Sequence, residues 1–231
     1  INDIVEIHDD LNPKLWYENN LRREVEHKLL QIAMAFIKFI NLPNLKLVDV
    51  TVSGSNASYN YNQNSDIDLH LVVDESSECI DELKELYLAK KSLFNDQHDI
   101  NIRGINVEVY VQEANQSHIS NGIYSVIHDE WLKQPEPITD TPDITNARHK
   151  FDFLQHEILE VIKSKDLAKM EKVKADLKKM RQSGLDAEGE FSAENLAFKM
   201  LRNLGDMEKL MTTIAKLRDQ ELSIEQQFQE E

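Results

Sequence analysis

The chain contains a single cysteine, five prolines and six glycines among its 231 residues. One cysteine, Cys79, excludes an internal disulfide framework and is typical of a protein from a reducing compartment such as the cytoplasm. No run of about 18 apolar residues occurs, so the sequence predicts no membrane span and no membrane partner. The first residues also lack the basic and apolar regions of a signal peptide. Since 41% of the residues are hydrophobic, a sizeable core is nevertheless expected.

Positive charge is scarce as well. Against 42 Asp and Glu the chain has 26 Lys and Arg, which gives a net charge of −16. This balance argues against extensive, sequence-independent binding of DNA or RNA, which requires a basic surface. The stretch 163–181 is an exception, with eight basic and three acidic residues. It is either a contact for a nucleic-acid acceptor such as a tRNA end or, more simply, a solvated helix.

Apolar periodicity predicts most of the helices. A short strand over 4–7 is followed by a helix over 18–40, with Trp16 and Tyr17 packed at its start. Prolines at 135, 137 and 142 mark a linker and place a domain boundary near 142. Three helices are then expected over 144–163, 166–182 and 195–217. Gly184 is expected to cap the second of these, and Leu204 to face inward from the third.

The most informative stretch lies between two predicted strands, 45–52 and 67–73. The first runs into Gly54-Ser55, and the second begins with Asp66-x-Asp68. Strand alternation sends Asp66, Asp68 and His70 to one face. Neighbouring carboxylates raise each other's pKa unless a cation lies between them, and Mg²⁺ is typically held by carboxylates together with substrate phosphates. The Gly-Ser turn offers backbone N–H groups and a hydroxyl to a phosphate.

A third carboxylate follows after a predicted helix over 80–94. Two strands, 99–103 and 105–112, are expected to form a hairpin around Arg103-Gly104. Glu108 lies in the second strand, within an apolar run that normally excludes an unpaired charge. It is either a metal ligand or an edge-strand side chain that points to water.

The pattern Gly54-Ser55, ten residues, then Asp66-x-Asp68 resembles the signature of the DNA polymerase beta-like nucleotidyltransferase superfamily. Within it the chain looks closest to the minimal nucleotidyltransferases, and more loosely like uncharacterised nucleotidyltransferase-like proteins of tailed bacteriophages. The resemblance covers residues 45–112. It implies an α+β fold, with a mixed sheet and flanking helices as catalytic domain over 1–142 and an all-α domain over 143–231. The Arg-Gly that often follows Gly-Ser in the minimal enzymes is absent.

The resemblance also implies roles for individual residues. Asp66, Asp68 and Glu108 would be the catalytic residues and the ligands of Mg²⁺ or Mn²⁺, and Glu108 would also take a proton from the attacking hydroxyl. The NTP, with ATP expected, would be bound by a second set: Gly54, Ser55, Ser65, Lys199 and Arg202. A short helix would follow the Gly-Ser turn. Independently of the resemblance, Tyr59 and Tyr61 either line a base or lid a pocket, or they pack between helix and sheet.

The expected reaction moves a nucleoside monophosphate from an NTP to a hydroxyl and releases pyrophosphate. The acceptor is a small molecule, a protein hydroxyl or an RNA end. Two alternatives stay open. One is a synthetase that joins nucleotides into an oligo- or cyclic nucleotide, and the other is a non-catalytic nucleotide- or partner-binding module, such as an antitoxin.

Overall fold

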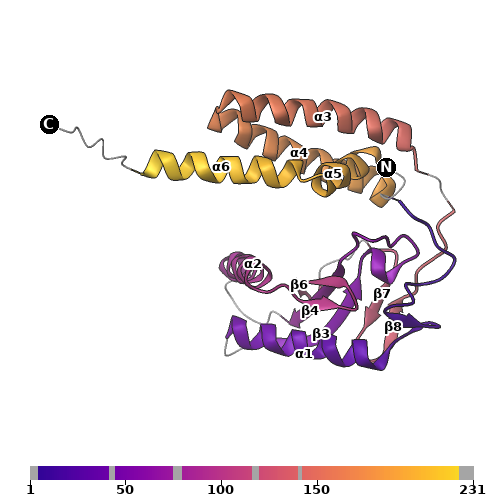
Figure 1. The fold of residues 1–231 in the computed structure, drawn as a ribbon. Helices are drawn as coiled ribbons and strands as arrows, with labels where there is room; N and C mark the ends of the chain where they lie inside the picture. Colours follow the sequence, from indigo (N-terminus) through magenta and orange to yellow (C-terminus); the bar gives the residue numbers. More distant parts are fainter. Residues whose placement is uncertain (1–4, 42–44, 75–79, 116–119, 140–141, 224–231) are drawn as a thin grey trace. The chain divides into compact units, whose positions relative to one another are not determined.

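A computed structural model describes residues 5–41, 45–74, 80–115, 120–139 and 142–223. The chain forms two compact units, Ile1–Thr139 and Asp140–Glu231 (Figure 1). The first unit contains a sheet with helices against it, and the described residues of the second form helices without a strand. The chain is therefore an α+β protein, which confirms the predicted fold class.

The main sheet of the first unit has six strands in the order β5-β6-β4-β3-β7-β8. Their bounds are β3 Lys46–Ser53, β4 Ile67–Asp74, β5 Asn101–Ile102, β6 Ile105–Glu113, β7 Ile123–Ser125 and β8 Glu130–Lys133. Only β4 and β6 pair in parallel, and the chain passes between them through helix α2, Ile80–Gln97. A parallel pair requires such a crossover. The predicted hairpin of the two strands around Arg103-Gly104 is confirmed.

Alternation along β4 separates the core from the polar face of the sheet. Ile67, Leu69 and Leu71 are fully buried, whereas Asp68 and His70 between them are half-buried. The apolar side of β4 packs against helix α1, Arg23–Ile40. Helix α2 lies against β6, and the two helices also contact each other (Figure 1). Asn41 ends α1 in the left-handed conformation, with φ of 52°, so the predicted helix end is confirmed.

The N-terminal segment differs from its prediction. Residues 5–7 of the predicted strand are irregular, while residue 4, like Cys79, lies outside the described residues. A small hairpin follows instead, made by β1, Trp16–Tyr17, and β2, Asn20–Leu21, around Glu18 with φ of 53°. Helix α1 therefore begins five residues later than predicted. Trp16 is buried and stacks on Trp131 of β8, with 4.8 Å between ring centroids, so it packs into the core of the sheet.

In its described part, residues 142–223, the second unit consists of four helices and a short turn. The helices are α3 Ile144–Ser164, α4 Leu167–Glu188, α5 Ala193–Asn203 and α6 Asp206–Leu222. Each of the first three has a side-chain N-cap, in which Asp143, Asp166 and Ser192 accept the backbone N–H three residues on. Such caps satisfy backbone donors that have no partner within the helix.

Three predictions for this unit are wrong. Gly184 does not end α4 but lies within it, where a Cβ would approach the Cβ of Glu194 to 2.6 Å. The glycine is there for close helix packing, and Gly189 ends the helix instead. The predicted helix over 195–217 is two helices, because the chain turns at Gly205 with φ of 79°. Leu204 at this turn is 66% exposed rather than inward.

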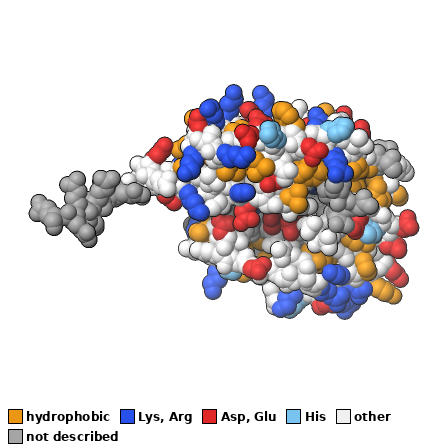
Figure 2. All heavy atoms as spheres, turned by 45° about the horizontal axis from the view of Figure 1, so that its top comes forward, with side chains coloured by type: hydrophobic (Ala, Val, Ile, Leu, Met, Phe, Trp, Pro, Cys, Tyr) orange, Lys and Arg blue, Asp and Glu red, His pale blue; other side chains and the backbone are white. Residues whose placement is uncertain are grey.

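Charged side chains of both signs are interspersed over the face shown in Figure 2. Among the helices of the described residues, none is long and apolar enough to cross a membrane.

Candidate functional site

The predicted carboxylates lie where three neighbouring strands meet. In the antiparallel pair of β3 and β4, Ser53 is opposite Asp68. In the parallel pair of β4 and β6, Asp68 is beside Glu108. All three side chains therefore point to the polar face of the sheet. Asp66 comes two residues before Asp68, directly ahead of β4. The strand register thus makes neighbours of Asp68 and Glu108, which are forty residues apart in the sequence.

Gly54 is in direct contact with one of these carboxylates. Its φ is 76°, and a Cβ at this position would lie 1.9 Å from Oδ2 of Asp68. Both the left-handed backbone and the close approach require glycine here. The N–H of Gly54 donates to Oγ of Ser120 at 3.1 Å, and the predicted short helix follows directly as a 3-10 turn, η1, over Ser55–Ala57.

Asn56 joins the turn to the start of β4. Its side chain is fully buried and its Nδ2 donates to the carbonyl oxygens of Ser65, at 3.1 Å, and Asp66, at 2.9 Å. Its Oδ1 accepts from Asn12 at 2.8 Å, while its carbonyl oxygen accepts from Trp16 Nε1 at 2.7 Å. A buried polar side chain with several partners specifies one backbone arrangement. Asn56 therefore fixes the backbone that leads into the Asp66-x-Asp68 motif.

The two predicted phosphate-binding hydroxyls bond to each other. Ser55 Oγ donates to Ser65 Oγ at 2.8 Å, and the latter also accepts the N–H of Asn62 at 2.9 Å. The hydroxyls of Ser55 and Ser65 are both half-buried. Ser65 thus closes the loop before β4 through its hydrogen bonds. Of the two hydroxyls, that of Ser55 lies directly after Gly54, at the start of η1.

Glu108 has a partner that the sequence did not reveal. The hydroxyl of Tyr110, two residues along the same face of β6, donates to Glu108 Oε2. The Tyr110 ring stacks on His70 with 5.0 Å between centroids, and the Lys91 ammonium lies 3.7 Å from the Tyr110 centroid. His70 also bonds through Nε2 to Ser53 Oγ at 3.1 Å. It therefore packs across strands β3, β4 and β6.

Electrostatics link this group to the carboxylates. Burial raises the pKa of the Tyr110 phenol, and the negative charges of Asp68, Glu108 and Asp66 raise it further. Burial lowers the pKa of Lys91, while Glu108 and Asp68 act in the opposite direction. Tyr110 is therefore a hydrogen-bond donor at neutral pH, and Lys91 lies within the field of two predicted metal ligands.

The donor set suits a hard divalent cation in chemistry. Asp66, Asp68 and Glu108 offer carboxylate oxygens alone, which are the ligands that Mg²⁺ prefers. Their arrangement is not a closed cage, however. Within the described ranges, no group of three or more His, Cys, Asp or Glu side chains is gathered closely enough to hold an ion. The hydrogen bond from Tyr110 already engages one of the three carboxylates.

The remaining predicted residues lie elsewhere. Tyr59 packs against the core, and Tyr61 stacks on His8 with 3.9 Å between centroids, so packing accounts for both rings. Lys199 and Arg202 lie on α5 in the second unit, and their assignment to the nucleotide stays a prediction.

Tyr110, Lys91, Asn56 and Ser120 were missed from the sequence. Tyr110 carried a usable signal, since strand alternation puts it on the face of Glu108. Asn56 directly follows the Gly-Ser pair, but an Asn in a loop is ordinarily a turn residue. Lys91 and Ser120 enter through tertiary packing, for which the sequence has no periodic signal.

Comparison with known proteins identifies no family. No family model matches the chain, and no curated protein matches it. Among solved structures, the chain is similar to a STING-associated CdnE c-di-GMP synthase from Capnocytophaga granulosa. The identity is 15%, the match covers 89% of this chain and 70% of that chain, and the TM-score is 0.26. That likeness is too weak to carry an argument about activity.

Proposed function

We propose that the protein is a nucleotidyltransferase that moves a nucleoside monophosphate from an NTP to a hydroxyl and depends on a divalent cation. One observation carries the proposal. The strand register puts Asp68 beside Glu108 and opposite Ser53, while the Gly54 backbone lies against the Asp68 carboxylate. The Gly54-Ser55 turn and the carboxylates thus adjoin each other, which supports phosphoryl transfer, because that reaction needs a phosphate-binding turn beside metal-binding carboxylates.

The residues would divide the work as follows. Asp66, Asp68 and Glu108 would hold Mg²⁺ or Mn²⁺, which when bound neutralises phosphate charge and stabilises the attacking and leaving oxygens. Ser55 and the backbone beside Gly54 would bind the β- and γ-phosphates. The N–H of Gly54 is bonded to Ser120, so this hydroxyl would give up the bond when a phosphate oxygen takes its place.

The chemical step is a displacement at the α-phosphorus. The acceptor oxygen forms a bond to this phosphorus, and the bond to the bridging oxygen breaks, which releases pyrophosphate. Glu108 would take the proton of the acceptor hydroxyl. For that step the hydroxyl of Tyr110 must leave at least one oxygen of Glu108 accessible, and it donates to Oε2 alone.

The test is incubation with each α-³²P-labelled NTP and Mg²⁺ or Mn²⁺, with and without total RNA and cell protein. We expect label in an acceptor with the wild type and a loss of at least 1,000-fold in Asp66→Asn/Asp68→Asn. Asp74→Asn is the matched control, because this carboxylate lies at the far end of β4 and pairs with Lys46 at 3.0 Å. A double variant as active as the control would overturn the mechanism.

A second candidate is a non-catalytic nucleotide- or partner-binding module. It is favoured by the bond from Tyr110 to Glu108 and by the lack of a ready metal cluster in the described part of the chain. The same assay separates the two. NTP binding that is lost in the double variant, without turnover in the wild type, indicates the module. A new small nucleotide released with pyrophosphate indicates a nucleotide-joining synthetase.

A further inference from the structure

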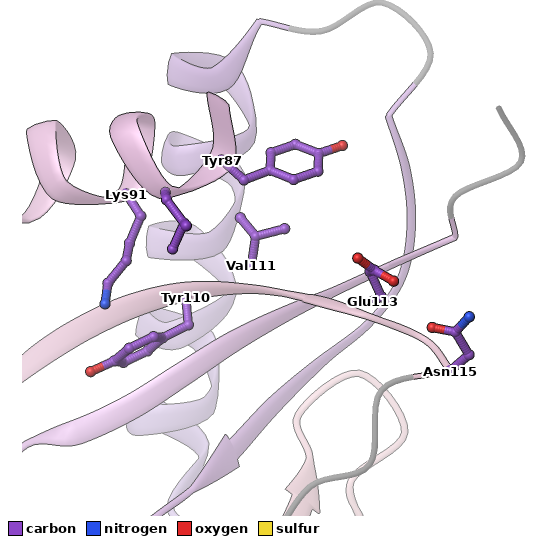
Figure 3. A pocket seen from close by; sticks show the side chains of 7 residues that line it. Tyr87, Lys91, Tyr110, Val111, Glu113 and Asn115 are labelled. Atoms are coloured by element: carbon purple, nitrogen blue, oxygen red, sulfur yellow. The ribbon is translucent and has the colours of Figure 1, made fainter. Parts of the chain in front are cut away.

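A cavity of about 440 Å³ lies between α2 and the end of β6. Lys91 and Tyr110 are at one end, Glu113 is at the other, and Val111 lies between them (Figure 3). Tyr87 and Leu88 of α2 form the opposite wall. The volume is within the range of about 300–1,000 Å³ found for ligand sites. Tyr110 and Lys91 also lie near Glu108, but no assignment above places a ligand in this cavity.

The cavity adjoins the outer edge of β6. In a parallel pair every second residue turns its N–H and C=O toward the neighbouring strand, and the others turn away. Ala114 N–H bonds back to Val73 of β4 at 2.9 Å, whereas Val107 N–H bonds outward to Ile100 at 2.9 Å. The odd-numbered residues of β6 therefore face outward. Val111 is one of them.

Along this edge of β6, the outward N–H and C=O groups have hydrogen-bond partners as far as Val109. Asn95 of α2 donates from Nδ2 to Val109 O at 3.1 Å and accepts Val109 N–H at 3.2 Å. Its carboxamide thus supplies a donor and an acceptor to one residue, as the backbone of an adjacent strand does. Among the hydrogen bonds of the described residues, none reaches Val111 from this side.

The residues on the face of α2 that points toward β6 explain why the backbone of Val111 has no partner on this side among the described residues. Lys91 and Tyr87 lie one and two turns before Asn95, on the same face of α2. Both line the cavity. The outward N–H and C=O of Val111 consequently face a space of ligand size.

We propose that an extended segment of another polypeptide binds in this cavity by adding a strand to β6 at Val111. Main-chain bonds give affinity in this mode of recognition, and pockets for alternate side chains give selectivity. The cavity follows the strand and has a cation at one end and a carboxylate at the other. It therefore suits an extended chain with an acidic side chain near Lys91 and an apolar one against Tyr87 and Leu88. The proposal goes beyond nucleotidyl transfer and requires neither metal nor NTP.

The test is amide NMR of the full chain with the blocked peptide acetyl-Thr-Glu-Val-Thr-Lys-amide and its reversed sequence as probes. In the free protein we expect the Val111 amide to exchange at least tenfold faster than that of Val109. Peptide addition should shift the Val111 resonance and slow its exchange at least tenfold. No change at Val111 with either peptide at millimolar concentration would overturn the proposal.

Two sets of controls make strand pairing distinguishable from other binding. Peptides methylated at alternate amide nitrogens should divide into one that binds normally and one that binds at least tenfold more weakly, because only alternate amides face β6. Equal effects would contradict pairing, as would displacement by adenosine alone. Leu88→Trp should fill the cavity and weaken binding at least fivefold. Leu93→Trp, at an exposed position of α2 away from the cavity, should not.

Discussion

The two units of the chain bury polar groups to different degrees. Of the twelve buried polar or charged side chains among the described residues, nine lie in the sheet unit and three in the helical unit. Those of the sheet unit bond across long sequence distances, as Asn12 does with Asn56 and Ser125 with Asp49. In the helical unit most side-chain bonds are helix caps or links within a turn or two. Buried polar networks are costly unless every member is satisfied, so they indicate where a defined backbone is required.

This difference concentrates the candidate chemistry in the sheet unit, and it can be tested in each unit separately. Both tryptophans, Trp16 and Trp131, are in the sheet unit. Their fluorescence therefore reports unfolding of that unit alone, while far-UV circular dichroism is weighted toward the helices.

The largest effect is expected from glycine replacement. Gly54→Ala combines a left-handed backbone with a clash against Asp68, and we expect a loss of about 3–4 kcal/mol in the sheet unit together with loss of transfer. Gly205→Ala has a similar φ but nothing within 4 Å of the added Cβ, so it should cost only about 1–2 kcal/mol. Urea unfolding followed by fluorescence and by dichroism measures both. Equal losses would show that the contact with Asp68 is not tight.

A somewhat smaller effect is expected from the two fully buried asparagines. Asn56→Ala removes three side-chain hydrogen bonds and leaves the part-buried carbonyl oxygens of Ser65 and Asp66 without this donor, for an expected loss of about 2–4 kcal/mol. Asn195 makes two bonds, accepting from Arg181 at 3.1 Å and donating to Glu190 at 2.7 Å. Asn195→Ala should therefore cost about 1–2 kcal/mol. If Asn56→Ala lowers the free energy of unfolding less than Asn195→Ala does, the hydrogen bonds of Asn56 do not determine the stability of the Gly-Ser turn.

Alkaline pH should weaken only the sheet unit, since all six tyrosines lie there. Burial raises the pKa of Tyr61, Tyr110 and Tyr124 above the ordinary 10.0. The folded unit then retains protons that the unfolded chain releases, so its stability is unchanged below pH 10 and falls as the pH rises further. Absorbance at 295 nm should show late-titrating phenols, and Tyr110→Phe should remove one. A single transition at the ordinary pKa would contradict this.

The smallest effect concerns an ion pair of the helical unit. Lys150 lies 2.8 Å from Glu194 with both side chains partly exposed, and this contact lowers the pKa of Glu194. The ion pair therefore stabilises the folded unit at pH values above 4.5, the ordinary pKa of a glutamate. This stabilisation is lost as the pH falls through the lower pKa that Glu194 has in the folded state. Glu194→Gln should cost at most about 1 kcal/mol at pH 7 and nothing in acid. Dichroism-monitored unfolding at pH 7 and pH 3 measures this difference.

The sequence predicted the structure best where a regular apolar periodicity ends at a residue that terminates a helix or strand. The period of 2 in β4 and the helical stripe of α1 were predicted correctly, as was the end of α1 at Asn41. The break at Gly205 was missed because the apolar spacing continues across it. Gly184 was taken for a cap because glycine fits both helix ends and close helix crossings. The carboxylates and the Gly-Ser turn were located from their motif, but Tyr110 as the partner of Glu108 and Lys91 above its ring depend on how α2 packs beside β6.

The parallel pairing of β4 with β6 also has a consequence for the order of folding. Asp68 and Glu108 are neighbours only after the intervening forty residues, including α2, have closed into a crossover. Pairing between distant residues loses loop-closure entropy before any contact forms, so it is slow. Contacts between residues close in sequence, as within helices, form quickly. A chain that has formed its helical hairpins and the β3–β4 pair still lacks the third carboxylate. Completion of the carboxylate set thus coincides with the slowest kind of contact in the molecule, and a partly folded chain would lack one of the three carboxylates on which the proposed activity depends.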